Sequence, residues 1–261
     1  MRTYGLIGFP LTHSFSKKHF TEKFLREGIL NTTYNLYPLP EIGELPALIK
    51  SVPELLGFNV TIPHKESIIP FLNELEPTAK QVGAVNTVKI KRQGSSVSLI
   101  GYNTDIFGFR QSIKPFLASH HERALVLGTG GASKAVAFVL NEIGVDCYYV
   151  TRSRKKGSSG NSSIPASKIF EYTEVTEYVI KHFPLIINTN PAGMYPHVND
   201  APEIPYAFLN ESHFLYDLIY NPEETRFLAE GKKKGALTLN GLSMLQQQAE
   251  KAWEIWNMPE Y

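Results

Sequence analysis

The sequence predicts an α/β protein with two sheets, one in each half of the chain. Short apolar stretches alternate with helical patterns throughout, and such alternation with short loops indicates parallel, helix-covered sheets. Glycines at 128, 130 and 131 separate an apolar run from a helical pattern, as in a Rossmann-like, doubly wound sheet. We therefore expect an N-terminal α/β domain over 1–105, onto which the C-terminal helix of 241–261 packs back, and a doubly wound domain over 106–240. Ligands bind at the carboxyl ends of such strands, so a cleft between the domains is the expected site.

Five strands are expected in the first half, because short apolar runs there end at glycine, proline or polar residues. They cover 4–8, 33–37, 56–60, 86–90 and 97–102, and a turn at 93–96 joins the last two. Helical patterns cover 17–27, which Gly28 closes, and also 42–49, 76–82 and 106–117. Pro63 suits the first turn of one more helix, with Thr61 near its cap.

The second half alternates more regularly between the two kinds of element. Strands are expected over 123–128, 145–150, 185–188, 214–219 and 237–239, with a short extended piece near 169. Helices are expected over 131–143, 175–182, 225–233 and 242–256. A Ser/Gly-rich segment at 156–163 has the composition of a loop.

The composition is that of an ordinary globular protein: 261 residues, 43% hydrophobic and 20% charged. Lys+Arg 26 against Asp+Glu 25 gives a net charge of +1, which excludes a strong electrostatic attraction to nucleic acid or an anionic membrane. The apolar run within 1–10 is too short for a signal peptide, and no stretch approaches the roughly 18 apolar residues that span a bilayer. The single cysteine, Cys147, cannot form an internal disulfide and lies in a predicted buried strand. We expect a cytoplasmic protein, with monomer and homodimer both open.

The glycine cluster is suited to a phosphate group. Without Cβ atoms, Gly128, Gly130 and Gly131 let the backbone approach a ligand closely. The helix N-terminus behind them offers N–H groups and a positive dipole end. The spacing is G-x-G-G-x-x-x-A, with Ala135 as the third small residue, so an ordinary strand-to-helix turn is the alternative interpretation.

The residues after the next expected strand favour one cofactor. An acid that binds the ribose 2′-hydroxyl normally stands there, but this chain has Thr151-Arg152-Ser153-Arg154-Lys155-Lys156. Arginine presents a planar fork to phosphate oxygens, so the segment favours the 2′-phosphate of NADP over NAD. Arg152, directly after the strand, is the preferred contact, whereas Lys155 and Lys156 are equally consistent with a solvated loop.

Polar side chains also follow the expected strands of the first half. They are Ser14, Ser16, Asn59, Thr61, Lys65, Asn86 and Asp105, whose hydroxyl, amide, amine and carboxylate groups suit a small polyhydroxylated acid. Each has a plainer alternative, because serines cap helices and lone charges are commonly surface groups. Spacing alone does not show that Lys65 and Asp105 lie close together.

Blocks containing these residues recur along the chain in a distinctive set. They are His13-Ser14-x-Ser16, Asn59-Val60-Thr61-Ile62-Pro63-His64-Lys65, Gly83-Ala84-Val85-Asn86-Thr87, Gly101-x-Asn103-Thr104-Asp105, Gly128-x-Gly130-Gly131-Ala132, Asn188-Thr189-x-Pro191-x-Gly193-Met194 and Gly241-x-x-Met244-Leu245-x-x-Gln248-Ala249. These blocks follow one another in the order of the shikimate dehydrogenase family, which the chain closely resembles over residues 5–249.

The resemblance implies an NADP-dependent enzyme that reduces 3-dehydroshikimate to shikimate on the route to chorismate and aromatic amino acids. By position, Lys65 and Asp105 are the implied catalytic pair, and Ser14 and Ser16 the implied contacts of the substrate carboxylate. Implied contacts to ring hydroxyls, direct or supporting, come from Asn59, Thr61, Asn86, Tyr220 and Gln248. Implied cofactor contacts come from Gly128, Thr129, Gly130, Gly131, Ala132, Thr151, Arg152, Ser153, Lys155, Asn190, Met194, Gly241 and Met244.

The chain departs from the family pattern in three places. Lys17 stands where proline is usual, which puts the start of the first helix in doubt. Thr129 replaces a common alanine in the glycine turn, and Thr151 replaces the asparagine of a usual Asn-Arg-Thr, so one adenosine contact is in doubt. Ser153 can supply the hydroxyl of the missing threonine.

The implied chemistry needs a cation and a proton donor, because hydride transfer to a ketone builds negative charge on its oxygen. Lys65 can supply both if Asp105 orients it. Three alternatives stay open: an NAD-using quinate/shikimate dehydrogenase, a non-catalytic ligand-binding paralogue, and a folate dehydrogenase of similar architecture. Ser16 and the basic segment at 151–156 argue against the quinate/shikimate dehydrogenase. The presence of both Lys65 and Asp105 argues against the non-catalytic paralogue, and the paired serines have no obvious use in a folate dehydrogenase. No metal is expected, because the pair His120-His121 has no partner at metal-ligand spacing.

Overall fold

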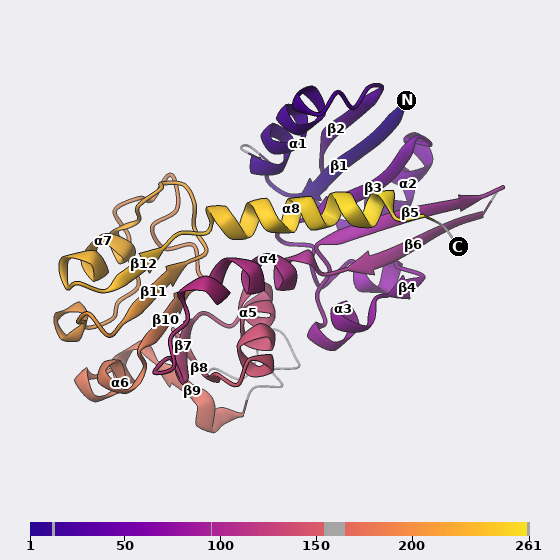
Figure 1. Cartoon of the computed structure of the whole chain (residues 1–261). Helices are drawn as coiled ribbons and strands as arrows, with labels where there is room; N and C mark the ends of the chain where they lie inside the picture. Colours follow the sequence, from indigo (N-terminus) through magenta and orange to yellow (C-terminus); the bar gives the residue numbers. More distant parts are fainter. Residues whose placement is uncertain (12–13, 95, 154–164, 260–261) are drawn as a thin grey trace. The chain divides into compact units, whose positions relative to one another are not determined.

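The chain folds into two compact units. The computed structural model in Figure 1 describes residues 1–11, 14–94, 96–153 and 165–259. One unit is Met1–Gly108 together with Leu245–Tyr261, and the other is Phe109–Met244. The limits fall inside helices α4 (Thr104–Ile113) and α8 (Leu242–Asn257). The domain limits expected from the sequence lie a few residues earlier in the chain.

The sheet of the first unit is mixed. Its strands are β1 (Arg2–Gly8), β2 (Thr32–Pro38), β3 (Leu55–Val60), β4 (Glu74–Leu75), β5 (Thr87–Gln93) and β6 (Ser96–Tyr102), in the order β2-β1-β3-β5-β6-β4. Strands β2, β1 and β3 are parallel, but β5 runs antiparallel to both β3 and β6. The expected parallel arrangement holds for β2, β1 and β3, and β5 and β6 form the antiparallel pair that the expected turn at 93–96 implies. The antiparallel pairing of β5 with β3 was not expected. The short strand β4 was not expected from the sequence.

Three helices of this unit begin and end at recognisable residues: α1 (Phe15–Arg26), α2 (Leu45–Ser51) and α3 (Pro77–Val82). Ser14 caps α1 by accepting from Lys17 N at 3.1 Å, and Glu76 caps α3 by accepting from the amides of Thr78 and Ala79. Gly83 ends α3 in the left-handed region, with φ +69°.

The helix expected after Pro63 does not form. Residues 61–68 make turns, and a short 3₁₀ helix follows at Ile69–Phe71. An α-helix would bond the carbonyl of Lys65 to the amide of Ile69, but this carbonyl accepts from Val85 N at 2.7 Å. The backbone of Lys65 is thereby tied to the segment that precedes β5.

Strand β1 separates two hydrophobic clusters, because successive side chains of a strand point to opposite faces. Tyr4 and Leu6 pack with α1 and α8, whereas Ile7 packs on the other face with α2. Trp256 of α8 stacks on Tyr4 with ring centroids 4.8 Å apart and donates to Val88 O at 3.0 Å. Gly57 makes this approach possible, because a Cβ there would lie 2.3 Å from the Trp256 ring.

The second unit has a parallel sheet. Its strands are β7 (Arg123–Leu127), β8 (Asp146–Thr151), β9 (Ile169–Glu171), β10 (Leu185–Asn188), β11 (Phe214–Asp217) and β12 (Leu237–Leu239), in the order β12-β11-β10-β7-β8-β9. Every pair of neighbours in this order is parallel. The first strand, β7, lies between β8 and β10, so the strand order reverses there, as expected for a doubly wound sheet. Helices α5 (Gly131–Glu142), α6 (Glu177–His182) and α7 (Arg226–Lys233) connect the strands.

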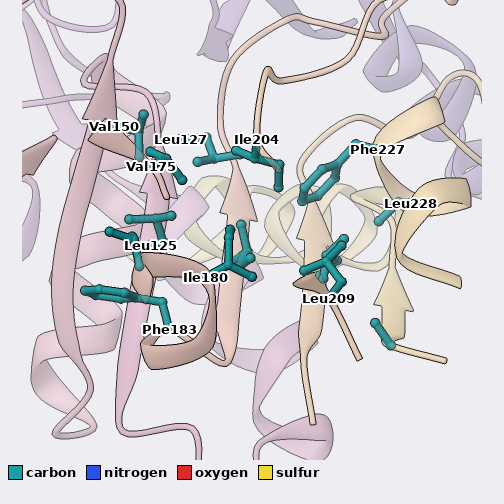
Figure 2. Packing of buried hydrophobic residues seen from close by; sticks show 14 residues of the cluster. Leu125, Leu127, Val150, Val175, Ile180, Phe183, Ile204, Leu209, Phe227 and Leu228 are labelled. Atoms are coloured by element: carbon teal, nitrogen blue, oxygen red, sulfur yellow. The ribbon is translucent and has the colours of Figure 1, made fainter. Parts of the chain in front are cut away.

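Buried aliphatic and aromatic residues cover one face of this sheet, as Figure 2 shows. Leu125 and Leu127 of β7 lie in one cluster with Ile180 of α6 and Phe227 of α7. Cys147 of β8 is 2% exposed, and burial raises the pKa of its thiol to about 12, as suits a core residue. None of the described helices has the length and hydropathy needed to cross a bilayer.

Candidate active site

Lys65 and Asp105 form an ion pair in the first unit. Lys65 Nζ donates to Asp105 Oδ2 at 2.7 Å, although the residues are forty positions apart. The two side chains are 22% and 11% exposed, so the pair is screened from most water and still open to a small ligand. Asp105 lies in the first turn of α4, where the helix dipole favours negative charge.

Asn86 connects this pair to the rest of the unit. Its Nδ2 donates to Asp105 Oδ1 at 2.8 Å and lies 3.4 Å from Gln248 Oε1 of α8. Its Oδ1 accepts from Thr104 N at 2.7 Å and from Thr87 Oγ1 at 3.2 Å. Asn86 and Gln248 are only 4% and 6% exposed, so the network holds their amides in fixed orientations.

Asn59 faces protein partners on both sides of its amide. Its Oδ1 accepts from the hydroxyl of Tyr34 at 2.8 Å, and its Nδ2 donates to Thr87 Oγ1 at 3.1 Å and Asn86 O at 3.3 Å. The side chain is 4% exposed. Asn59 was expected either to contact the ring hydroxyls of the substrate or to support the residues that do. This geometry suits the supporting role.

Ser14, Ser16 and Thr61 are half-buried. Ser14 is the cap of α1, and Ser16 lies in the first turn of that helix. The plain alternative, a helix cap, thus holds for Ser14, and a cap does not exclude a second role as a ligand contact. Thr61 follows β3 with its methyl group over Gly8, where a Cβ would lie 2.4 Å away. Its amide donates to Ile7 O at 2.9 Å.

The glycine turn of the second unit has the geometry of a phosphate cradle. Gly128 adopts φ +126°, and a Cβ there would lie 2.6 Å from Thr189 Oγ1. Nothing lies within 4 Å of the Cβ position at Gly130, which caps α5 without a side-chain hydrogen bond. Thr129 is exposed, and Gly131 and Ala132 begin the helix half-buried. The helix N-terminus is therefore open to an anion.

Of the polar and basic residues expected after β8, the structure describes Thr151, Arg152 and Ser153. Thr151 ends the strand, and its Oγ1 donates to Ser153 O at 3.3 Å. Arg152 and Ser153 are exposed. Lys155 lies outside the described residues. No acidic residue stands between 151 and 156.

The remaining expected cofactor residues lie after β10, after β12 and at the start of α8. Asn190 donates to Tyr172 OH at 3.1 Å and accepts from Ala192 N at 2.9 Å, so it shapes its loop. Met194 is 47% exposed, but Met244 is only 7% exposed. Gly241 donates to Ile219 O at 3.0 Å, and a Cβ there would lie 2.0 Å from Leu218 O, so only glycine fits. Tyr220 is half-buried in the same stretch.

The structure adds polar residues that the sequence analysis missed. Tyr34, Thr87 and Thr104 belong to the network around Asn59 and Asn86. Thr87 and Thr104 lie within two of the recognised blocks, which was the one signal that could have identified them. Tyr34 has no such signal, because its sequence neighbours are those of an ordinary strand.

Asp217 is also missed, although a carboxylate ending the apolar strand Phe214–Asp217 was a visible signal. It is fully buried and accepts from Thr225 Oγ1 at 2.6 Å and from Asn188 Nδ2 and Ile219 N, each at 3.0 Å. Burial raises its pKa to about 6, against the opposing effect of these three hydrogen bonds.

The described residues contain no group of three or more His, Cys, Asp or Glu side chains that could hold a metal ion. His121 is buried, which lowers its pKa to about 4, and its Nδ1 accepts from Ala118 N at 2.9 Å. His120 contacts Ser212 O at 3.1 Å. Both rings thus have structural partners.

Comparisons with known proteins give one consistent result. A family model described as the shikimate dehydrogenase substrate binding domain matches residues 6–88. A shikimate dehydrogenase (NADP(+)) from Carboxydothermus hydrogenoformans is 39% identical over 260 residues, which are 97% of this chain and 90% of the relative. The crystal structure of shikimate dehydrogenase from Aquifex aeolicus is 35% identical, with a TM-score of 0.84 over 100% of this chain and 94% of that chain. Shikimate 5-dehydrogenase from Thermus thermophilus, solved with NADP(H) and shikimate, is 30% identical, with a TM-score of 0.81 over 100% of this chain and 95% of that chain.

Proposed function

We propose that this chain, which belongs to the shikimate dehydrogenase family, catalyses the reversible NADPH-dependent reduction of 3-dehydroshikimate to shikimate. This reaction serves the biosynthesis of chorismate and the aromatic amino acids. The observation that carries the proposal is the Lys65–Asp105 ion pair, whose carboxylate is held by Asn86. The pair lies in the first unit, which includes the residues that match the substrate-binding family model. The glycine turn of the second unit supplies the complementary cofactor site.

Lys65 is assigned the proton transfer. When bound, NADPH supplies the hydride for the carbonyl carbon of the substrate. The Lys65 ammonium, placed beside the carbonyl oxygen, stabilises the developing negative charge and gives that oxygen a proton. Asp105 holds Lys65 Nζ at 2.7 Å and thereby sets the position of the donated proton. In the reverse direction, neutral Lys65 takes the hydroxyl proton while the hydride leaves to NADP.

The substrate is held by the polar groups of the first unit. Ser14 and Ser16 are assigned the carboxylate, because their hydroxyls lie at the start of α1, where the helix dipole favours an anion. Thr61, Asn86 and Gln248 are assigned the ring hydroxyls, with Asn59 supporting them. Tyr220 is assigned a contact to the same ligand.

The residues of the second unit fit NADP. The open N-terminus of α5 suits a pyrophosphate, and Gly128, Thr129, Gly130, Gly131 and Ala132 would hold it there. Thr151, Arg152, Ser153 and Lys155 would take the 2′-phosphate, because cations and hydroxyls replace the acid that NAD requires. Asn190, Met194, Gly241 and Met244 would surround the nicotinamide.

One assay tests the function. The purified chain should form NADPH from NADP in the presence of shikimate, with NAD and quinate run as parallel arms. Preference for quinate and NAD would replace the proposal with a quinate dehydrogenase. Binding of both ligands without NADPH formation would indicate a non-catalytic paralogue.

The place of action and the assembly state belong to the same proposal. We place the protein in the cytoplasm, because its single cysteine is buried and unpaired, as suits a reducing compartment. A monomer and a homodimer are both compatible with this site, since the Lys65–Asp105 network lies within one chain. Light scattering of the purified protein distinguishes the two.

A further inference from the structure

Tyr34 is a buried tyrosine whose hydroxyl reaches the candidate active site. It lies in β2, is 1% exposed and stacks on Phe20 with ring centroids 4.6 Å apart. Its ring alone would fill this space, as phenylalanine does at several neighbouring positions. The hydroxyl donates to Asn59 Oδ1 at 2.8 Å and also has a hydrogen bond with Ser16.

The direction of this hydrogen bond follows from the other partners of Asn59. The carbonyl of Asn86, 3.3 Å from Asn59 Nδ2, is an acceptor only, so the nitrogen of the amide must face it. The oxygen of Asn59 therefore faces Tyr34, and Tyr34 must donate. Without that donor the oxygen would be a buried acceptor that lacks its hydroxyl partner, and the Asn59 amide would be held from its nitrogen side alone.

Asn59 is linked through further hydrogen bonds to the reactive pair. Its Nδ2 donates to Thr87 Oγ1 at 3.1 Å, and Thr87 Oγ1 donates to Asn86 Oδ1 at 3.2 Å. Asn86 Nδ2 in turn donates to Asp105 Oδ1 at 2.8 Å. The Asn86 carbonyl decides which end of the Asn59 amide faces Tyr34, and Thr104 N and Asp105 decide the orientation of the Asn86 amide. Tyr34 completes this connected network on the Asn59 side.

Tyr34 also lies beside Ser16, in the first turn of α1. Burial raises the pKa of its hydroxyl, and a hydrogen bond with Ser16 has a smaller, opposite effect. Lys17, the residue that replaces the usual proline, donates from Nζ to the backbone carbonyl of Tyr34. The start of α1 and the Tyr34 hydroxyl are therefore held to one another.

We propose that Tyr34 is a positioning residue for substrate binding: its hydroxyl restrains the Asn59 amide, and Asn59 through Thr87 restrains the amide of Asn86, the residue assigned to the ring hydroxyls of shikimate. This inference rests on the proposed function. Tyr34 does not touch the reacting atoms, so it acts on the affinity for the sugar-like ring and not on hydride or proton transfer.

The variant Tyr34→Phe tests this directly, because it removes one oxygen and keeps the stacked ring. An orphaned acceptor of this kind raises KM for shikimate about tenfold, while kcat changes less than about threefold and KM for NADP stays unchanged. The matched control is Tyr4→Phe, a buried tyrosine of the same aromatic cluster, which should leave all three constants at their wild-type values.

A second measurement follows the amide itself. Side-chain NH₂ resonances of Asn59, assigned by their loss in Asn59→Asp, should shift and exchange with solvent faster in Tyr34→Phe, but not in Tyr4→Phe. Unchanged Asn59 resonances, or a KM for shikimate within about twofold of wild type, would overturn the positioning role. A parallel loss in kcat and both KM values would show a merely structural role. If wild-type protein turned over no shikimate, the proposed function would fail, and the NH₂ resonances would still decide whether Tyr34 orients Asn59.

Discussion

The two oxygens of the Asp105 carboxylate serve different partners. Oδ2 accepts from the Lys65 ammonium at 2.7 Å, and Oδ1 accepts from the Asn86 amide at 2.8 Å. The amide fixes the plane of the carboxylate, and the carboxylate then fixes the ammonium. The Lys65 ammonium is thus held in one position by the Asp105 carboxylate, as its proposed role in proton transfer requires.

Replacing Lys65 by methionine should lower kcat by roughly 10²–10⁴-fold, the usual scale for a group that transfers a proton, with a smaller change in KM. Steady-state kinetics with shikimate and NADP measure this. Lys80→Met, at an exposed position of α3, is the matched control and should leave kcat unchanged. A rise in KM at constant kcat would assign Lys65 to binding.

Ser14 and Ser16 are both assigned to the substrate carboxylate, but only Ser14 caps α1. Both Ser14→Ala and Ser16→Ala should raise KM for shikimate and leave KM for NADP unchanged, because both lose a hydroxyl assigned to the carboxylate. Ser14→Ala should also lower the free energy of unfolding by about 0.5–2 kcal/mol, since Ser14 caps α1. Urea denaturation of Ser14→Ala tests this, and an unchanged free energy of unfolding would contradict the cap role.

At the scale of elements, Asp217 joins three pieces of the second unit. It accepts from Asn188 at the end of β10, from Ile219 just after β11 and from Thr225, the cap of α7. All three donors are neutral, so the hydrogen bonds only partly offset the cost of burying a charge. The carboxyl therefore has a pKa raised to about 6.

The raised pKa makes a stability prediction with a definite sign. Because the folded state binds this proton more tightly than the unfolded chain, the stabilisation is complete below about pH 4 and is lost as the pH rises through about 6. Relative to Asp217→Asn, which does not titrate, the wild type should lose up to about 3 kcal/mol of unfolding free energy between about pH 4 and pH 7. Urea denaturation across this range measures it, with Asp200→Asn at an exposed position as the control. A difference that is constant with pH would contradict the burial of a titrating carboxyl.

At the scale of the whole molecule, the first unit is built from two separated stretches of chain. Its last stretch, Leu245–Tyr261, brings Gln248 to Asn86 and Trp256 to Tyr4. The substrate-binding unit therefore is complete only when the last helix has been added to the first 108 residues.

Trp256→Ala should accordingly lower the free energy of unfolding by about 3–5 kcal/mol, because it removes a buried aromatic ring and the hydrogen bond to Val88 O. Chemical denaturation followed by circular dichroism measures the loss. Asn257→Ala, the next residue on the exposed side of α8, should cost less than about 0.5 kcal/mol. Comparable losses in the two variants would show that α8 does not complete this core.

The element pattern could be read from the sequence because it depends on near neighbours. Strands β10 and β12 have the predicted limits, since short apolar runs bounded by polar or glycine residues leave little choice. The helix expected at Pro63 failed for the opposite reason, because a distant amide, Val85 N, takes the carbonyl that the helix needs. The β5–β6 hairpin follows from the expected turn at 93–96, but the antiparallel pairing of β5 with β3 was not predicted, because these strands are separated in the sequence by residues 61–86.

By itself the sequence determined the α/β class, the glycine turn before α5, the absence of an acid after β8 and the set of candidate polar residues. Only the tertiary structure decided that Lys65 forms an ion pair with Asp105 and that Gln248 approaches Asn86 from 162 positions away. It also decided that Tyr34 and neighbouring residues supply the hydrogen-bond partners of Asn59. Helices and strands form through contacts within a few residues of the sequence. A site, in contrast, combines residues from several strand ends and helices, and the strand order and the core packing decide which of these lie next to one another. Those choices depend on the burial of the whole chain at once.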